Sequence, residues 1–478
     1  MPKILLVKSV TSPAPFLMVT PPLGLMYISS VLRQKGHDIR ILDMRLDKLK
    51  PKEVVKRFKD FKPDIVGFSA LTLEANLMHQ VAALLKKEDK RCKIIVGGPH
   101  SSSYPQETLS DKNIDFLVLG EGEQTAPELV EAIEYNRDFK NVRGIAFRYN
   151  GQITLTLPRP PITDLDSLPF PAWDLIEMDK YFQRYRWALF YSYLARPYMT
   201  LFTSRGCPYH CIYCHNIFGK AFRARSPESV MAEIETLINR YNIRDFEILD
   251  DCFNFDLPRA KRICDLIVEK RLNVKLALVN GVRGDIMDEE LIYKLKKAGT
   301  YLIMYGVETA SPCLQKFIKK YLNLDKIKQM ISITAQLGIS THGYFMLGFP
   351  TESKEEILKT IKFAVQTDLE TATFYIANPF GGTELLKISK QLGKNVSANF
   401  DDYSYDKTNL NLSEFEDKKL FALQRKAYRM FYLNRKRAVQ ILANFDKRAL
   451  LIMIPLVLEM AFSKRRKIPR YSLLRLLR

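Results

Sequence analysis

Cysteine is scarce in this chain, with seven in 478 residues. A disulfide scaffold needs a far higher density, so a reducing, cytoplasmic compartment is expected. The cysteines are also unevenly spread, because Cys207, Cys211 and Cys214 crowd into eight positions. That crowding points to a metal or cluster site.

Long apolar runs are missing as well. The first residues, MPKILLVKS, hold too short an apolar run for a secretory signal and fit a first β-strand. Near the other end, the apolar segment 449–462 contains Pro455 and Glu459 and is shorter than the ~20 residues that cross a bilayer. No membrane span is expected.

Acidic residues are outnumbered, with 53 Asp and Glu against 73 Lys and Arg, which gives a formal net charge of +20. Such an excess favours an anionic partner, whether nucleic acid, anionic lipid headgroups or a phosphorylated substrate, and charge alone does not choose among them. The hydrophobic content of 47% is that of a folded globular protein. The length predicts two large domains with appendages.

The first 138 residues alternate short β-branched runs with helical patterns. Strands are expected at KILLVKS, DIRILDM, DIVGFSA, KIIVGG and DFLVLGEGE, with helices between them. This alternation predicts a parallel, doubly wound, Rossmann-like α/β domain, whose ligand lies beyond the carboxyl ends of the strands. Residues 139–195 then form a connector with a hairpin and a proline-rich crossing.

From residue 196 to 385 the βα rhythm resumes, with strand-like segments at MTLFTS, FEILDD, KLALVN, YLIMYGVE, YFMLGF and TFYIANP. Six such units predict a partial (β/α)6 barrel with its active site at the carboxyl ends of the strands. Residues 386–478 are expected to form a mostly helical, basic C-terminal region.

The run SRGCPYHCIYCHNIFGK gives Cys207, Cys211 and Cys214 spacings of three and two intervening residues. Three thiolates can ligate three irons of a four-iron four-sulfur cluster and leave the fourth iron open to a chelating ligand. A zinc site would need a fourth ligand, which His210 or His215 could supply. Chance clustering is the other alternative.

This run resembles the signature of the radical S-adenosylmethionine (SAM) superfamily, and the resemblance covers about residues 200–385. It implies a [4Fe–4S] cluster whose open iron is chelated by the methionine part of SAM. An electron from a reducing partner such as flavodoxin or ferredoxin would cleave SAM to methionine and a 5′-deoxyadenosyl radical. That radical abstracts hydrogen from unactivated carbon.

The resemblance also implies SAM-binding residues at the barrel strand ends. Asp250 and Asp251 lie where the family holds the methionine amine, although LDD here replaces the common glycine-glycine-glutamate form. Arg283 would pair with the SAM carboxylate, as guanidinium groups do in bidentate fashion. Helix caps or surface ion pairs are the structural alternatives for these positions. The remaining members are Glu308 for the ribose hydroxyls, and Tyr213 and the backbone around Met346 for the adenine.

A doubly wound domain before such a barrel resembles the cobalamin-binding class of the superfamily, which includes radical SAM methylases and the anaerobic Mg-protoporphyrin cyclase. The pieces FSALT, VGGPHSS and LGEGE fit that class. A Rossmann-type nucleotide site is the alternative, but no GxGxxG follows the first strand. The residues expected to bind cobalamin are Ser69, Thr72, Gly97, Gly98, Glu121 and Gly122.

The DxHxxG signature that ligates cobalt elsewhere is absent, and neither His37, His79 nor His100 has that context. The resemblance therefore implies base-off cobalamin without a histidine on cobalt. It also favours methyl transfer through methylcobalamin to an unactivated carbon. Cyclisation, oxidation or rearrangement without methyl transfer is the alternative within the class, and a non-enzymatic cobalamin or iron–sulfur sensor is an alternative of another class.

A transfer RNA methylthiotransferase would carry three further N-terminal cysteines, whereas only Cys92 lies there, so a nucleic-acid substrate is not expected. The C-terminal tail from Lys447 holds nine Lys or Arg against the single acid Glu459, interleaved with apolar residues. Such a segment can lie on an anionic membrane surface, here the inner face, and would favour a lipid-like small molecule as substrate. A helix that packs on the barrel with a solvated basic face is the alternative.

Overall fold

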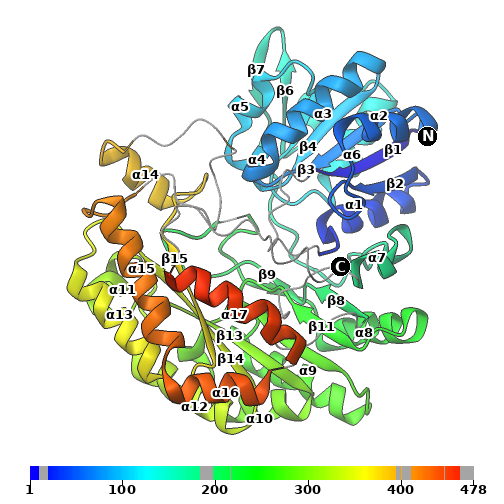
Figure 1. Cartoon of the computed structure of the whole chain (residues 1–478). Coiled ribbons are helices and arrows are strands. Elements are labelled where there is room, and N and C mark those ends of the chain that lie inside the picture. The colour runs from blue at the N-terminus through cyan, green and yellow to red at the C-terminus, as the bar shows by residue number, and fades with distance from the viewer. Residues whose placement is uncertain are drawn as a thin grey trace.

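The computed structural model describes residues 1–9, 20–182, 197–215, 217–394, 400, 411–445 and 447–462. Within them, two α/β units and a helical C-terminal region follow one another along the chain (Figure 1). The α/β fold class predicted from the sequence is confirmed.

The N-terminal unit is a seven-stranded sheet of order β2-β1-β3-β4-β5-β6-β7, in which β1 to β5 are parallel. Its central strands are apolar on both faces because helices cover both sides of the sheet. Its elements are β1 (Lys3–Lys8), α1 (Leu23–Gln34), β2 (Asp38–Asp43), α2 (Pro51–Phe61), β3 (Ile65–Ser69), α3 (Ala75–Glu88), β4 (Lys93–Gly97), α4 (Pro99–Ser103), α5 (Pro105–Ser110), β5 (Phe116–Val118), α6 (Thr125–Glu134), β6 (Ile145–Tyr149) and β7 (Gln152–Leu155).

The hairpin β6–β7 belongs to this sheet, because β6 pairs antiparallel with β5. Arg148 of β6 fixes it to the neighbouring loop by donating to the carbonyl oxygens of Leu109 and Ile114. The proline-rich segment that follows runs back along α1, where the Ser30 hydroxyl donates to the Phe170 carbonyl oxygen at 2.6 Å. The N-terminal sheet thus extends to Leu155.

The second unit is a six-stranded, all-parallel sheet of order β15-β14-β13-β12-β11-β8 with helices on its outer side. This is an open partial barrel. Its elements are α7 (Met178–Phe182), β8 (Tyr198–Leu201), β9 (Ser204–Arg205), β10 (Arg223–Ala224), α8 (Pro227–Tyr241), β11 (Asp245–Ile248), α9 (Leu257–Glu269), β12 (Lys275–Val282), α10 (Glu289–Lys297), β13 (Thr300–Glu308), α11 (Pro312–Phe317), α12 (Leu324–Gln336), β14 (Ser340–Leu347), α13 (Lys354–Gln366) and β15 (Thr371–Ile376).

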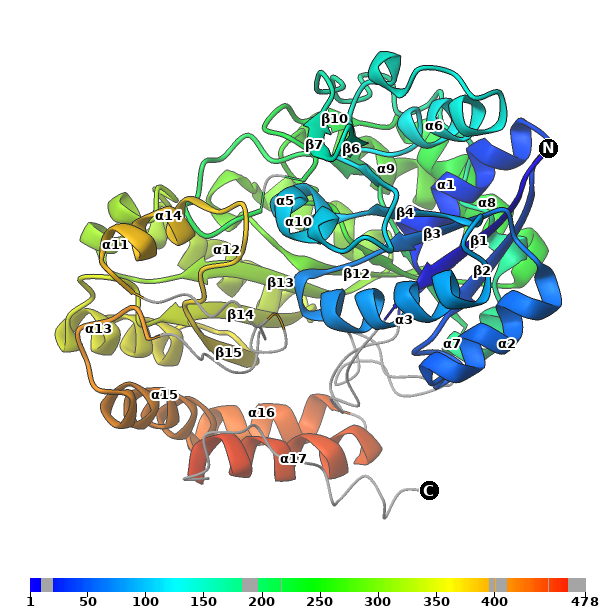
Figure 2. The ribbon, with the colours of Figure 1, turned by 90° about the horizontal axis from the view of Figure 1, so that it is seen from above.

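The C-terminal region comprises α14 (Glu384–Gln391), α15 (Asp417–Tyr432), α16 (Arg435–Asn444) and α17 (Lys447–Phe462). Seen from above, α15 to α17 lie together beyond β15 (Figure 2). Helix α15 covers this edge strand: the Tyr428 hydroxyl accepts from the Phe374 N–H at 3.1 Å, and the Tyr432 hydroxyl donates to the Ala372 carbonyl oxygen at 2.8 Å. Backbone groups on the open side of the edge strand β15 are thereby hydrogen-bonded.

Two contacts join the carboxyl ends of the two sheets. The loop after β5 reaches the segment after β8 through ion pairs between Glu121, Glu123 and Arg205. The ring of Tyr104, which follows β4 and α4, lies so close to Gly381, after β15, that a Cβ there would be 2.2 Å from it. The first and last strands of the barrel are therefore both covered by strand-end loops of the N-terminal unit.

Candidate active site

The cysteine-bearing loop begins and ends on a short ribbon. Strands β9 and β10 pair antiparallel, with Arg205 opposite Arg223, and the loop between them carries all three motif cysteines. Gly206 has a φ of 81°, and a Cβ on it would lie 2.3 Å from the Ala221 carbonyl oxygen. Only glycine lets the loop close this tightly.

The structure brings the motif cysteines together at the carboxyl end of β8. Donation from the Cys252 thiol lowers the pKa of Cys207 to about 7, and donation from the Cys214 thiol lowers the pKa of Cys211 to about 6. Among the described residues, no three His, Cys, Asp or Glu side chains converge closely enough for a single metal ion. Three thiolates on one loop suit the three ligated irons of a four-iron cluster.

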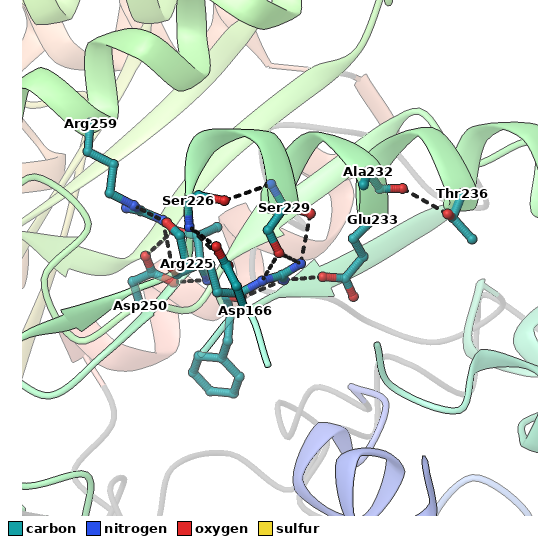
Figure 3. Close-up of polar contacts among 11 residues, drawn as sticks. Asp166, Arg225, Ser226, Ser229, Ala232, Glu233, Thr236, Asp250 and Arg259 are labelled. Carbon is teal, nitrogen blue, oxygen red and sulfur yellow. Dashed lines mark hydrogen bonds and ion pairs between the residues drawn. The ribbon is translucent and has the colours of Figure 1, made fainter. Parts of the chain in front are cut away.

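Asp250, which follows β11, holds the start of the cysteine loop through hydrogen bonds. Its carboxylate accepts from the Thr203 N–H at 2.6 Å, from the Thr203 hydroxyl, and from the Ser204 hydroxyl at 2.7 Å. Figure 3 shows Asp250 close to Arg259 and Arg225 around this segment, where Arg259 donates to the carbonyl oxygens of Thr203 and Arg225. Both Asp250 oxygens are therefore occupied.

Asp251 and Arg283 lie beside the loop, and each has a hydrogen-bonding atom without a partner among the described residues. The Asp251 side chain is exposed, and one of its oxygens accepts from the Gly206 N–H at 3.0 Å. Arg283 lies over the Tyr209 ring at 3.7 Å and holds Asp285 through two nitrogens at 2.9 and 3.1 Å. Its Nη1 is buried and has no hydrogen-bond partner among the described residues. Arg283 therefore forms an ion pair with Asp285 and keeps one nitrogen without a described partner.

Glu308 ends β13 with a left-handed φ of 65°, a conformation that non-glycine residues rarely adopt and that occurs at functional sites. It accepts from the buried Lys320 ammonium at 2.7 Å, and Gly306 leaves room for that pair. The Lys320 nitrogen lies 6.0 Å from the centre of the Tyr213 ring. Tyr213 and Met346 belong to one apolar cluster. Glu308, Tyr213 and Met346 therefore surround one region at the strand ends.

The carboxyl edge of the N-terminal sheet brings the predicted cobalamin residues together. Ser69 ends β3 beside Gly97 of β4, and Gly98 has a φ of 92° with the Ser69 hydroxyl 3.0 Å from where its Cβ would be. Thr72 is buried in the turn that follows β3. Gly98 is thus required for the close approach of the β3 and β4 loops.

Glu121 and Gly122 lie in the loop after β5, and the Glu121 side chain points to the barrel. It pairs with Arg205 at 3.2 Å and Arg223 at 2.9 Å, and it accepts from the Ile162 N–H at 2.8 Å. Gly122 packs on Ile28 of α1, which a Cβ would approach to 2.8 Å. The Glu121 carboxylate is therefore already bound by the barrel arginines.

Sequence reasoning missed three residues at these edges. Cys252 contacts Cys207, and Lys320 pairs with Glu308. His100 is fully buried with neither ring nitrogen bonded to a described residue, and burial lowers its pKa to about 4. The sequence did hold a signal for two of them. Cys252 directly follows the predicted site residue Asp251, and His100 comes two positions after Gly98.

Comparison with known families agrees with this arrangement. The B12 binding domain family matches residues 14–130, and the Radical SAM superfamily matches residues 201–364. An uncharacterised methyltransferase of Pyrococcus horikoshii is 34% identical over 87% of this chain and 88% of its own length. The cytidylyl-2-hydroxyethylphosphonate methyltransferase of Streptomyces wedmorensis is 30% identical over 77% of each chain.

Relatives with other names are less similar than those two. The anaerobic magnesium-protoporphyrin IX monomethyl ester cyclase of Rubrivivax gelatinosus is 26% identical over 87% of this chain and 74% of its own length. The hopanoid C-3 methylase of Methylococcus capsulatus is 28% identical over 76% of this chain and 67% of its own. Among solved structures, the cobalamin-dependent SAM radical enzyme OxsB has the same fold, with a TM-score of 0.73 and 17% identity over 96% of this chain and 75% of that one.

A doubly wound domain followed by a cysteine-loop barrel defines the class of radical SAM enzymes with a B12-binding domain. This chain belongs to that family, and its cofactors are a [4Fe–4S] cluster, SAM and cobalamin. The residues present fit these groups: three clustered cysteines for iron, a buried Arg283 nitrogen lacking an acceptor, and a buried His100 whose ring nitrogens have no hydrogen-bond partner among the described residues. The comparisons favour methyl transfer over cyclisation.

Proposed function

We propose that this enzyme transfers a methyl group to an unactivated carbon of a hydrophobic substrate. The observation that carries the proposal is the meeting of two carboxyl edges, because the strand ends expected to hold cobalamin contact the cysteine loop through Glu121 and Glu123. When bound, the cluster supplies an electron for SAM cleavage and cobalamin supplies the methyl group. The relatives at 34% and 30% identity are both named methyltransferases.

The residues around the cysteine loop would bind and orient SAM. Asp251 has a free oxygen for the methionine amine, whereas Asp250 is used by Thr203 and Ser204. Arg283 Nη1 would donate to the SAM carboxylate, and one hydrogen bond there is possible without displacing Asp285. Glu308 would accept from the ribose, with Tyr213 and Met346 beside the adenine.

The edge of the N-terminal sheet would hold cobalamin base-off, with no histidine on cobalt. Gly97, Gly98 and Gly122 offer backbone close to the strand ends, and Ser69 and Thr72 offer hydroxyl groups. His100, which is part of α4, is buried in the interior of the domain, with the ring centres of Tyr104 and Phe400 at 5.4 and 4.6 Å. These features support the ligation state that the missing signature implies.

The outer surface of the C-terminal region supports a hydrophobic substrate taken from an anionic membrane. Helix α17 buries Met453 and Ala461 against its neighbours, yet its outer face is also apolar: Leu451, Ile454, Leu458 and Phe462 are 62%, 43%, 47% and 53% exposed. The neighbouring helices add exposed apolar side chains at Met430, Leu433, Val439 and Leu442. The basic residues of the tail from Lys464 onward lie outside the described residues. Arg435 and Lys436, at the start of α16, are exposed basic residues of the same helical region.

An exposed apolar patch accompanied by basic residues is the pattern of proteins that lie on anionic bilayers. No described helix is long and apolar enough to cross a membrane. Contact would therefore be peripheral. A one-electron donor protein such as flavodoxin or ferredoxin is the second partner required, and Cys214 leaves one side of the cysteine loop exposed toward it.

Methyl-deuterated SAM tests the proposal. Anaerobically reconstituted enzyme would be given reductant and lipid extract, and the products analysed by mass spectrometry. We expect deuterated methyl in a product, with 5′-deoxyadenosine and S-adenosylhomocysteine formed in about equal amounts, because one SAM supplies the radical and a second the methyl group.

Two results would contradict methyl transfer. Substrate-dependent 5′-deoxyadenosine without label in any product would favour cyclisation or oxidation. Absence of 5′-deoxyadenosine with every reductant and extract would favour a sensor.

A further inference from the structure

Four charged side chains join the two α/β units at the base of the cysteine loop. Arg205 pairs with Glu123 at 2.6 Å and with Glu121 at 3.2 Å, and Arg223 pairs with Glu121 at 2.9 Å. All four side chains are at most 6% exposed. The glutamates belong to the loop after β5, and the arginines are cross-strand partners on β9 and β10.

This group is electrically balanced only while the units stay together. Two carboxylates face two guanidinium groups, and loss of one partner while the units stay in contact would leave a buried charge unpaired, which is strongly unfavourable. The Arg205 guanidinium is also held between the rings of Tyr27, from α1, and Phe218, from the cysteine loop, at 5.1 and 5.2 Å. The contact therefore fixes both distance and orientation.

The group is connected to both cofactor sites by very short stretches of chain. Cys207 is two residues after Arg205, and the intervening Gly206 is locked by its close approach to Ala221 and by the Asp251 carboxylate. On the other side, Glu121 and Glu123 flank Gly122 in the loop expected to approach cobalamin. A shift in one loop must therefore move the other.

We propose that Glu121, Glu123, Arg205 and Arg223 form an interdomain clamp that sets the placement of cobalamin relative to the iron–sulfur cluster. They are positioning residues, since none of them is expected to touch the reacting atoms. The proposal needs cobalamin at the edge of the N-terminal sheet, as the family assignment gives, but it does not depend on whether a methyl group is transferred.

The test uses full-length enzyme loaded with cluster and cobalamin. Glu123→Gln and Arg205→Lys each weaken the clamp with little change in volume. Glu233→Gln is the matched control, because Glu233 forms a buried ion pair with Arg225 that involves no residue of the loop after β5. The readout is the electron paramagnetic resonance spectrum of the chain carrying both the reduced cluster and cobalt(II) cobalamin, whose magnetic coupling depends on their separation.

We expect both clamp variants to keep full iron and cobalamin content while the coupling weakens or becomes heterogeneous, and 5′-deoxyadenosine formed without product to rise several-fold. The control should keep the wild-type coupling. Wild-type coupling in both clamp variants would overturn the proposal, as would an equal change in Glu233→Gln.

Hydrogen exchange of the unloaded chain covers variants that fail to take up cofactors. In Glu123→Gln, a substitution in the N-terminal unit, we expect faster exchange in the barrel peptide containing β9 and β10, several-fold above wild type. Arg205→Lys should in turn speed exchange around Gly120 to Gln124. Changes confined to the substituted unit would show that the loops are not coupled and would overturn the clamp.

Discussion

Arg283 Nη1 and both ring nitrogens of His100 are buried atoms without a hydrogen-bond partner among the described residues. A buried donor without an acceptor costs about 1–3 kcal/mol, so such atoms are uncommon unless something else binds there. Arg283 lies beside the cysteine loop and His100 beside the β4 glycines. Both residues lie next to positions that the sequence predicts to bind ligands, Arg283 near the SAM residues and His100 near the cobalamin residues.

The motif cysteines give the most direct prediction at this scale. Replacing Cys207, Cys211 and Cys214 with Ala should abolish both the cluster and SAM cleavage, because these thiolates are the expected iron ligands. Reconstituted wild-type chain should carry about four irons and four sulfides. Iron and sulfide analysis with Cys313→Ala, an exposed cysteine outside the loop, provides the control. A four-iron cluster surviving in the triple variant would refute the assignment.

Glu352, after β14, gives a prediction on pH dependence. Burial raises its pKa to about 8, although the N–H groups of Gly348 and Phe349 donate to it. Because an unfolded glutamate titrates near pH ~4.3, the protonated form stabilises the fold: this stabilisation is complete below about pH 4.3 and is lost as the pH rises through about 8.

Glu352→Gln keeps a neutral acceptor at every pH. We expect its melting temperature to exceed that of the wild type at alkaline pH and to vary less between about pH 5 and 9. Thermal unfolding of the unloaded chain measures this. Glu356→Gln, in which burial is opposed by donors that lower the pKa, is the control. Parallel pH curves for Glu352→Gln and wild type would contradict the expected protonation.

At the scale of elements, α15 and α17 play different parts. Helix α15 completes the barrel, because Gln424, Tyr428 and Tyr432 satisfy the backbone of the edge strand β15. Helix α17 packs on α15 and leaves an apolar stripe at Leu451, Ile454 and Leu458 with helical spacing. That stripe serves no packing function among the described residues.

The stripe predicts binding to anionic vesicles. Wild-type chain should sediment with phosphatidylglycerol vesicles, less so in high salt, and much less with phosphatidylcholine vesicles. Leu451→Ser with Leu458→Ser should reduce the bound fraction several-fold. Tyr293→Ser, which removes an apolar side chain 50% exposed on α10, should leave binding unchanged. Equal binding by the double variant and wild type would exclude α17 as the contact.

At the scale of the whole molecule, the two units face each other across their strand ends. The loop after β5 contacts the segment after β8, and Tyr104, after β4 and α4, contacts Gly381, after β15. These contacts hold the N-terminal sheet over both sides of the barrel opening. Removing one partner of a buried ion pair costs about 3–5 kcal/mol of stability. The ion pairs of this interface therefore favour one arrangement of the two units.

The sequence by itself determined the two-unit α/β architecture, the six-stranded barrel and the cysteine loop. These follow from local patterns, since β-branched runs alternating with helices specify parallel sheets and a spacing of three and two residues specifies a cluster loop. The cofactors followed from family resemblance. The placement of individual SAM and cobalamin residues stays a prediction.

Only the tertiary structure decided how particular side chains are used. The Asp250 carboxylate accepts hydrogen bonds from Thr203 and Ser204. Glu121 forms an ion pair with Arg205, and the Cys252 thiol contacts Cys207. Each of these contacts joins segments about 45 to 85 positions apart, so no local spacing or propensity encodes it. The sequence places a charge at a strand end, but which neighbour satisfies that charge depends on how the two sheets pack together.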